Sequence, residues 1–351
     1  MKLKTSITSI ALGLVMVALG VCAFIESPSA APAPSALLLN GTGATFPYII
    51  YSKWFTEYNR IHPDIQINYN SLGSGAGIRQ LQAGTVDFGA SDVPMTDDQL
   101  HQAKVPALHF PTVLGAVVAT YNIEGVSQEL NFTGEALADI FLGKITKWND
   151  PALAAINKGV NLPNTDIVVV HRSDGSGTSF VWTDYLSKVS KEWETKVGRN
   201  ASVNWPVGLG GKGSEGVTGL VKQTPGALGY VELTYAIQNQ LLYGRVKNSA
   251  GVFQKADLAA VTAAAASEAK KMPADFRVSI TDPSGKAAYP ICTFTYMLIP
   301  AKIDDPAKKK AIKDFLHWML TDGQNDAEGL LYAKLPKDVV ARELKAIGQI
   351  N

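Results

Sequence analysis

The chain has 351 residues, 46% of them hydrophobic and 18% charged, and its 32 Lys and Arg residues nearly balance 31 Asp and Glu residues. This balance argues against a nucleic-acid partner, because binding to a polyanion requires a strongly basic face or segment. The apolar content, with 31 Gly and 18 Pro spread along the chain, indicates a globular protein rather than a disordered or fibrous one. The length fits about two domains.

Residues 1–30 have the pattern of a secretory signal peptide. Two lysines near the start precede an apolar stretch, and small residues and prolines follow it, which suits cleavage between Ala23 and Ala36. An uncleaved transmembrane anchor is the alternative, since the apolar stretch is nearly long enough to span a bilayer. We expect cleavage, and a mature protein that is exported across the inner membrane.

Of the two cysteines, only Cys292 lies beyond the predicted signal peptide. An exported chain with one cysteine has no internal disulfide, so its packed core must hold the fold together. Val21, rather than a small residue, precedes Cys22, which argues against lipid attachment there. The five histidines show no metal-ligand spacing, so no metal site is predicted.

From residue 37 onward, short apolar strands alternate with amphipathic helices. Repeated alternation of this kind predicts an α/β protein with mainly parallel sheets covered by helices on both faces. The predicted strands are 37–40, 65–69, 86–90, 167–170 and 228–231. The predicted helices are 48–60, 78–83, 135–142, 179–189, 256–271, 306–320, 323–331 and 337–347.

Two longer apolar runs, 108–121 and 289–299, stand on either side of the middle of the chain. The first run is too long for one ordinary strand and is interrupted by Pro111. Two similar segments flanking an inserted α/β unit suggest two lobes joined by a double-strand hinge. The expected lobes are residues 37–112 plus 292–351 for lobe I, and residues 113–291 for lobe II.

Three loops, 41–47, 71–77 and 171–178, each lead from the end of a predicted strand into the start of a helix. Their glycines let the backbone approach a ligand closely, and the first N–H groups of a helix are unpaired and carry about half a positive charge. One such loop would be explained by ordinary turn and capping chemistry, but three together predict an oxyanion site. Four hydroxyl groups add possible donors, those of Thr45, Ser74, Ser176 and Thr178.

Three charged residues complete this pattern. Arg172 lies in the third loop, where its planar guanidinium can bind two oxygens of a tetrahedral anion, and Asp174 can orient it. Asp92 follows the predicted strand 86–90, at the edge where open α/β sheets bind ligands. A carboxylate suits an anion that carries a proton, since Asp92 can accept the hydrogen bond of a P–O–H group. Sulfate would instead place two acceptors face to face.

These motifs resemble those of the periplasmic phosphate-binding proteins of phosphate-specific ABC transporters, the PstS family. The likeness runs from about Leu38 to the C-terminus, with further similar stretches at 141–148, 208–213 and 225–232. The motifs that carry it are Gly43-Ala44-Thr45-Phe46-Pro47, Gly73-Ser74-Gly75-Ala76-Gly77, Val86-Asp87-Phe88-Gly89-Ala90-Ser91-Asp92 and Arg172-Ser173-Asp174-Gly175-Ser176-Gly177-Thr178-Ser179.

The resemblance implies a two-lobed periplasmic-binding-protein fold of type II that closes on one phosphate ion. It implies a monomer that captures phosphate with high affinity in the periplasm and passes it to inner-membrane permease subunits with a cytoplasmic ATPase. It implies neither a catalytic residue nor a cofactor. Carried over to this chain, the phosphate-binding residues are Ala44, Thr45, Phe46, Ser74, Asp92, Arg172, Ser176, Gly177 and Thr178, with Asp174 holding Arg172.

Rival functions fit less well. A serine hydrolase would need Gly at position 174, where Asp stands, and segment 208–213 lacks the spacing of a nucleotide-binding P-loop. A receptor for sulfate or molybdate conflicts with Asp92. Arsenate, which is nearly isosteric with phosphate and also protonated, fits the same residues, and so does a secreted phosphate scavenger that serves no transporter.

Overall fold

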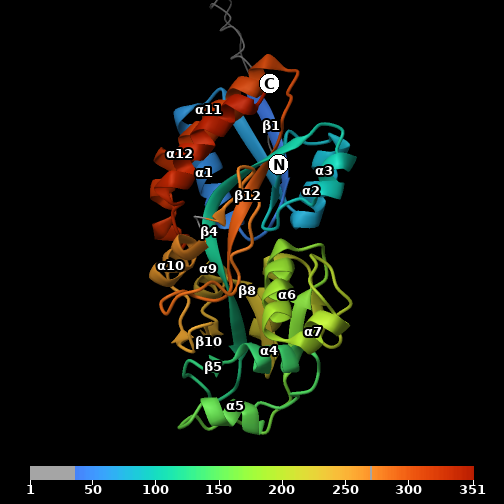
Figure 1. Ribbon diagram of the computed structural model, residues 1–351, viewed down its shortest axis with the longest axis vertical. Coiled ribbons are helices and arrows are strands. Elements are labelled where there is room, and N and C mark those ends of the chain that lie inside the picture. Colours follow the sequence, from blue (N-terminus) through green and yellow to red (C-terminus); the bar gives the residue numbers. More distant parts are fainter. Residues whose placement is uncertain (1–35, 269–270) are drawn as a thin grey trace, which may run out of the picture. The chain divides into compact units, whose positions relative to one another are not determined.

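The computed structural model describes residues 36–268 and 271–351 (Figure 1). The predicted signal peptide and Cys22 lie outside the described residues. Within the described residues, no helix is both long and apolar enough to cross a membrane. The helices are α1 (Tyr48–Ile61), α2 (Ser74–Ala83), α3 (Asp97–Gln102), α4 (Gly134–Phe141), α5 (Pro151–Ile156), α6 (Gly177–Val189), α7 (Lys191–Lys196), α8 (Gly213–Gln223), α9 (Leu233–Gln238), α10 (Leu258–Glu268), α11 (Pro306–Leu320) and α12 (Lys337–Ala346).

In the described part of the chain, one large mixed sheet has the strand order β2-β1-β3-β12-β4-β8-β6-β7, with β9 paired to β4. A small second sheet has the order β11-β10-β5. The strands are β1 (Leu37–Gly43), β2 (Ile65–Ser71), β3 (Phe88–Ser91), β4 (Ala107–Asn122), β5 (Asn131–Phe132), β6 (Val168–Arg172), β7 (Leu209–Gly211), β8 (Ala227–Glu232), β9 (Leu242–Tyr243), β10 (Arg245–Lys247), β11 (Phe253–Gln254) and β12 (Cys292–Pro300).

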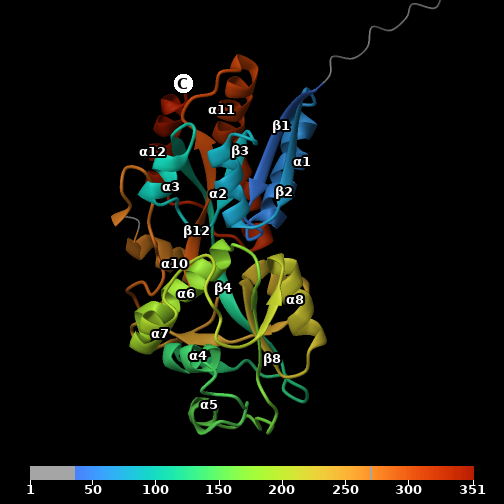
Figure 2. The same ribbon diagram turned by 90° about the vertical axis from the view of Figure 1, so that its right-hand side faces the viewer.

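The large sheet passes through two lobes (Figures 1 and 2). In the first lobe, β1 pairs in parallel with β2 and β3, and α1, α2 and α11 pack on these strands. In the second lobe, β6 pairs in parallel with β7 and β8, and α6 and α8 pack on them. Strand β12 is antiparallel to both β3 and β4, and β4 is antiparallel to β8. The expected strand–helix alternation is therefore confirmed in both lobes.

The apolar run 108–121 forms part of one strand, β4, so the expectation that it is too long for a single strand was wrong. Residues Leu108–Ala116 of β4 pair with β12, and Val117–Asn122 pair with β8. The strand can be long because it belongs to both lobes in turn. Pro111 is tolerated because it adjoins an irregularity in the β4–β12 register, where Thr112 of β4 has no partner between the pairs Val113–Thr295 and Pro111–Tyr296.

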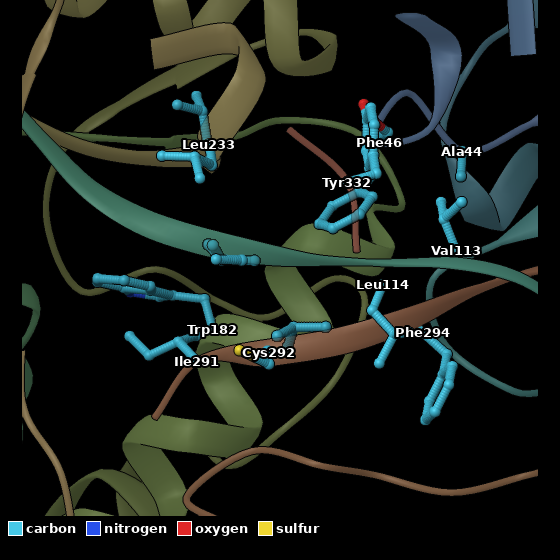
Figure 3. Close-up of a cluster of buried hydrophobic side chains, with 14 of the residues drawn as sticks. Ala44, Phe46, Val113, Leu114, Trp182, Leu233, Ile291, Cys292, Phe294 and Tyr332 are labelled. Atoms are coloured by element: carbon cyan, nitrogen blue, oxygen red, sulfur yellow. The ribbon is translucent and has the colours of Figure 1, made fainter. Parts of the chain in front are cut away.

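A buried apolar cluster surrounds the place where β4 and β12 run side by side (Figure 3). Val113 and Leu114 of β4 pack in it beside Phe294 of β12, and all three are fully buried. Cys292, the free thiol at the start of β12, is also fully buried and acts as a small apolar residue. The cluster includes Trp182 of α6, from the second lobe, so both lobes contribute to packing at the crossing strands.

Helix α11 shows how local sequence sets an element's bounds, and its predicted range, 306–320, is confirmed. Asp305 caps it, because its Oδ1 accepts the Ala307 N–H at 2.8 Å. Pro306 occupies the first helical position, where no hydrogen-bond donor is needed. The apolar residues of α11 then pack against the first-lobe core.

Three helix predictions need correction. Segment 323–331 is not one α-helix but two short 3-10 turns, Asp322–Asp326 and Glu328–Leu330. Glycines weaken a continuous helix there, and Leu331 takes a left-handed backbone conformation with φ 65°. Helix α2 begins at residue 74 rather than 78, and α6 at residue 177 rather than 179. The glycine-rich loops therefore continue directly into helix N-termini.

Candidate anion-binding site

Helices α1, α2 and α6 begin where β1, β2 and β6 end, as the three loops predicted. The first turns of these helices contain no acidic residue, whereas those of α3, α4 and α7 contain Asp or Glu. No side chain on the three helices therefore neutralises the partial positive charge at their N-termini. Three such helix N-termini favour an anion as the ligand, although the Asp92 carboxyl also lies beside the starts of α2 and α6.

Asp92 lies directly after β3 and is only 2% exposed. Its Oδ1 accepts a hydrogen bond from Thr295 Oγ1 at 2.9 Å, and its Oδ2 accepts a longer one from Ser74 Oγ at 3.4 Å. Burial raises the pKa of Asp92 to about 7, against the opposing hydrogen bonds from Thr295 and Ser74 and the charge of Arg172. With a pKa of about 7, the Asp92 carboxyl can be either protonated or ionised near neutral pH.

Arg172 is the last residue of β6 and is 3% exposed. Its Nε and Nη2 donate to the two carboxylate oxygens of Asp174 at 2.8 and 2.6 Å, and its Nη1 lies 3.5 Å from Thr178 Oγ1. Burial acts to raise the pKa of Asp174, but the hydrogen bonds and charge of Arg172 outweigh it, and the pKa is lowered. Asp174 thus holds the guanidinium by two parallel hydrogen bonds, as the sequence predicted.

The site brings the two lobes into contact. Gly177, at the start of α6, lies so close to first-lobe residues that a Cβ there would stand 2.5 Å from Ser74 Oγ and 2.6 Å from Asp92 Oδ2. The N–H of Gly75 donates across the same boundary to the carbonyl of Gly175 at 2.9 Å. The residues predicted from the second and third loops, together with Asp92, are therefore not separate groups but one buried constellation.

Three buried residues precede α1, namely Ala44, Thr45 and Phe46. They differ in whether their backbone N–H groups are free to bind a ligand. The N–H of Ala44 donates to the Ala90 carbonyl at 3.0 Å, so this donor is already used within the first lobe. Among the described residues, no acceptor engages the N–H groups of Thr45 and Phe46. These two residues can supply backbone donors, whereas Ala44 can only border the site.

The third loop provides a cap as well as donors. Ser176 is the N-cap of α6, and its Oγ accepts the Ser179 N–H at 3.0 Å. A hydroxyl that accepts one bond retains its own proton, so Ser176 can still donate. Gly177 and Thr178 follow at the first helical positions, where the backbone N–H groups have no partner within the helix.

Two parts of this constellation were not predicted from the sequence. One is Thr295, whose hydroxyl orients Asp92; the alternation of Thr293 and Thr295 within an otherwise apolar run was the available signal. The other is the N-terminus of α8. The N–H of Gly213 donates to Asp174 Oδ1 at 3.0 Å, and the N–H of Ser214 donates to Thr45 Oγ1 at 3.2 Å.

Comparison with known proteins identifies the family. The chain matches the family model of the PBP superfamily domain over residues 28–323. It is 44% identical over 315 residues to the phosphate-binding protein PstS of Xylella fastidiosa (strain Temecula1), which covers 90% of this chain and 86% of the relative. It is also 44% identical over 308 residues to the phosphate-binding protein PstS of Pasteurella multocida, covering 88% of this chain and 89% of the relative.

A solved structure shows the shared fold. The phosphate-binding protein of Stenotrophomonas maltophilia aligns with a TM-score of 0.67 at 18% identity, over 88% of this chain and 94% of that chain. The expected two-lobed periplasmic-binding-protein fold of type II is thereby confirmed. The chain belongs to the PstS family of phosphate-binding proteins, within the PBP superfamily.

Proposed function

We propose that this protein binds inorganic phosphate with high affinity and delivers it to an ABC-transporter permease for import, without catalysis and without a cofactor. The observation that carries the proposal is the pairing of opposite charges in one buried site. Arg172 supplies the cation for an anion, while Asp92 lies in the same constellation and suits an anion with a proton. The relatives at 44% identity are named phosphate-binding proteins, which supports the proposal.

In this proposal, phosphate is held by donors from both lobes. Thr45 and Phe46 give backbone N–H groups, and Ser74 gives its hydroxyl. From the second lobe, Arg172 donates through its guanidinium, and Asp174 keeps that group in position. The remaining donors come from the start of α6, at Ser176, Gly177 and Thr178. Each is a hydrogen bond from a preorganised group, so little reorganisation is needed when the anion enters.

We propose that Asp92 recognises the phosphate by its proton. One proton lies between Asp92 Oδ2 and a phosphate oxygen, whichever of the two carries it. Above about pH 7, the ionised carboxylate and sulfate would both be acceptors, and their repulsion would oppose binding. Arsenate satisfies the same geometry as phosphate, so we expect it to bind.

The partners and location follow from this function. We propose a periplasmic monomer, produced by removal of residues 1–30, that docks on inner-membrane permease subunits coupled to a cytoplasmic ATPase. We further propose that residues 37–112 plus 292–351 move as one lobe and residues 113–291 as the other, about β4 and β12. The change of partner along β4, from β12 to β8 after Ala116, supports a hinge in this region.

Retention of radiolabelled phosphate in equilibrium dialysis tests the binding function. We expect the mature protein to retain one phosphate per chain, and to release it to unlabelled phosphate but not to an equal concentration of sulfate above about pH 7. Delivery is tested by expressing the full chain in cells that lack their own phosphate-binding protein. Restored uptake at low phosphate is expected; retention without restored uptake would indicate a scavenger rather than a transport receptor.

Gly177→Ala should weaken phosphate binding by about 1 to 3 kcal/mol, because the added methyl group would collide with Asp92 and Ser74 when the lobes meet. The clash involves groups from different lobes, so the melting temperature without phosphate should change little. Calorimetric titration with phosphate measures the loss. Gly219→Ala in α8, where a Cβ would meet nothing within 4 Å, is the matched control and should bind like the wild type. Equal affinities for both variants would contradict the arrangement.

A further inference from the structure

The N-terminal turn of α8 and the side chain of Tyr235 in α9 form a set of hydrogen bonds between the lobes. Both elements belong to the second lobe, yet their partner is Thr45, which belongs to the first. Thr45, Ser214 and Tyr235 are each no more than 4% exposed, so these hydrogen bonds are shielded from water. The family motifs used to assign the phosphate ligands do not include Ser214 or Tyr235.

The contacts of Thr45 are specific. Its Oγ1 accepts the Ser214 N–H at 3.2 Å and lies 2.8 Å from Ser214 Oγ. Its carbonyl accepts the Tyr235 hydroxyl at 2.7 Å, and the same hydroxyl lies 3.0 Å from Oε1 of Glu215, the residue after Ser214. One first-lobe residue is therefore bound through both its side chain and its backbone by neighbouring groups of the second lobe.

One arrangement of these contacts leaves the proton of the Thr45 hydroxyl available for another acceptor. A hydroxyl has one proton to donate and two lone pairs to accept with. When Ser214 donates through both its N–H and its O–H, both lone pairs of Thr45 are occupied. In that arrangement the Thr45 proton is not used by Ser214, so the hydroxyl is left able to donate to a bound anion.

The same helix turn reaches the other side of the site. Gly213, the residue before Ser214, donates its N–H to Asp174, and Asp174 holds Arg172. A chain of direct contacts therefore runs from Thr45 through α8 to the guanidinium. Because a hydrogen bond across the lobes is made only when they meet, its free energy favours the closed state over the open one.

We propose that Ser214 and Tyr235 form an interlobe latch on Thr45 that holds the protein closed and directs the Thr45 hydroxyl toward the bound anion. They are positioning residues, since they act through Thr45 and not by contact with phosphate. The inference rests on the proposed function, because phosphate is the anion around which the lobes close. Closure stabilised by the latch should slow the release of phosphate and leave its capture by the open form unchanged.

Dissociation of radiolabelled phosphate, chased with excess unlabelled phosphate, tests the latch. We expect Ser214→Ala and Tyr235→Phe each to speed dissociation roughly 2- to 10-fold with an unchanged association rate, and the double variant to speed it further. Ser214→Thr keeps the hydroxyl and should retain most of the slow release. Small-angle scattering at saturating phosphate should show a larger radius of gyration for the double variant.

Two matched variants remove hydroxyl groups that lie outside the latch. Ser187→Ala and Tyr185→Phe are in α6, and among the described residues neither hydroxyl has a hydrogen-bond partner. Both should release phosphate like the wild type. Dissociation rates of the Ser214 and Tyr235 variants equal to these controls, with wild-type protein that binds phosphate, would overturn the latch. A wild type that fails to bind phosphate would instead contradict the proposed function itself.

Discussion

Arg172→Ala should weaken phosphate binding by about 2 to 5 kcal/mol, roughly a 30- to 5,000-fold rise in Kd. The side chain is buried, and it is held by two hydrogen bonds to Asp174. Its loss removes the only side-chain cation among the proposed phosphate ligands. It also leaves Asp174 without its charge partner close to the anion, which adds repulsion. Calorimetric titration with phosphate measures the change.

One further variant separates charge from geometry at this position, and another serves as a control. Arg172→Lys keeps the positive charge but loses the planar fork, so we expect an affinity between those of the wild type and Arg172→Ala. Arg60→Ala, at an exposed position on α1, should leave the affinity unchanged. If Arg172→Ala bound phosphate as tightly as Arg60→Ala, the anion site would have to lie elsewhere.

Asp92→Asn should collapse the discrimination between phosphate and sulfate. The asparagine can present an N–H donor where the ionised carboxylate presented an acceptor, so sulfate no longer faces an opposing charge. Phosphate loses the acceptor for its proton, and we expect its affinity to fall while that of sulfate rises, each by about 1 to 3 kcal/mol. Competition between the two anions, measured in the variant and the wild type, gives the ratio. A variant that still rejects sulfate fully would show that Asp92 does not discriminate between phosphate and sulfate.

The same substitution should stabilise the protein without phosphate at alkaline pH. In the folded state burial raises the pKa of Asp92 to about 7 from 3.8, so the wild type loses stability as pH rises from about 4 to about 7. Since a tenfold change in an acid constant corresponds to about 1.4 kcal/mol, the loss is on the order of 4 kcal/mol. Asparagine cannot ionise, so the Asp92→Asn variant does not lose this stability.

Urea denaturation at about pH 5 and about pH 8 measures this difference. The gain in the free energy of unfolding for Asp92→Asn over the wild type should be larger at the higher pH. Thr295→Val provides a comparison, because it removes the hydrogen bond to Asp92 Oδ1 while leaving the carboxylate in place. That variant should be less stable than the wild type at the higher pH, the opposite sign to Asp92→Asn.

Much of the fold could be predicted because its signals are local. The alternation of apolar runs with amphipathic helices gave the element order, and capping residues such as Asp305 set helix starts. The length of β4 could not be predicted from the sequence. Its first part pairs with β12 and its second part with β8, so it is longer than an ordinary strand. Pro111 also looked like a break in the strand, although an extra residue of β4, Thr112, lies beside it and accommodates it.

Some residues of the candidate site could likewise be proposed from the sequence, and others could not. Arg172 and Asp92 could be proposed from the sequence because each is a charged residue at a strand end, and Arg172 also lies in a glycine-rich loop that leads into a helix. Thr295 and Ser214 were not assigned, because their roles depend on contacts between segments far apart in the chain, 203 residues for Thr295 with Asp92 and 169 for Ser214 with Thr45. Sequence spacing carries no information on such contacts. The glycine-rich segment 208–213 before α8 resembles the three loops in composition. We compared it only with a nucleotide-binding P-loop, so its place beside the site was not predicted.

Calorimetric titration of the wild-type protein with phosphate and with sulfate at about pH 8 is the strongest test of whether Asp92 selects a protonated anion. At that pH Asp92 is ionised, so only an anion that carries a proton can be matched to it. We expect one phosphate to bind per chain, and sulfate to bind more weakly by several kcal/mol. Sulfate binding as tight as phosphate binding would contradict it.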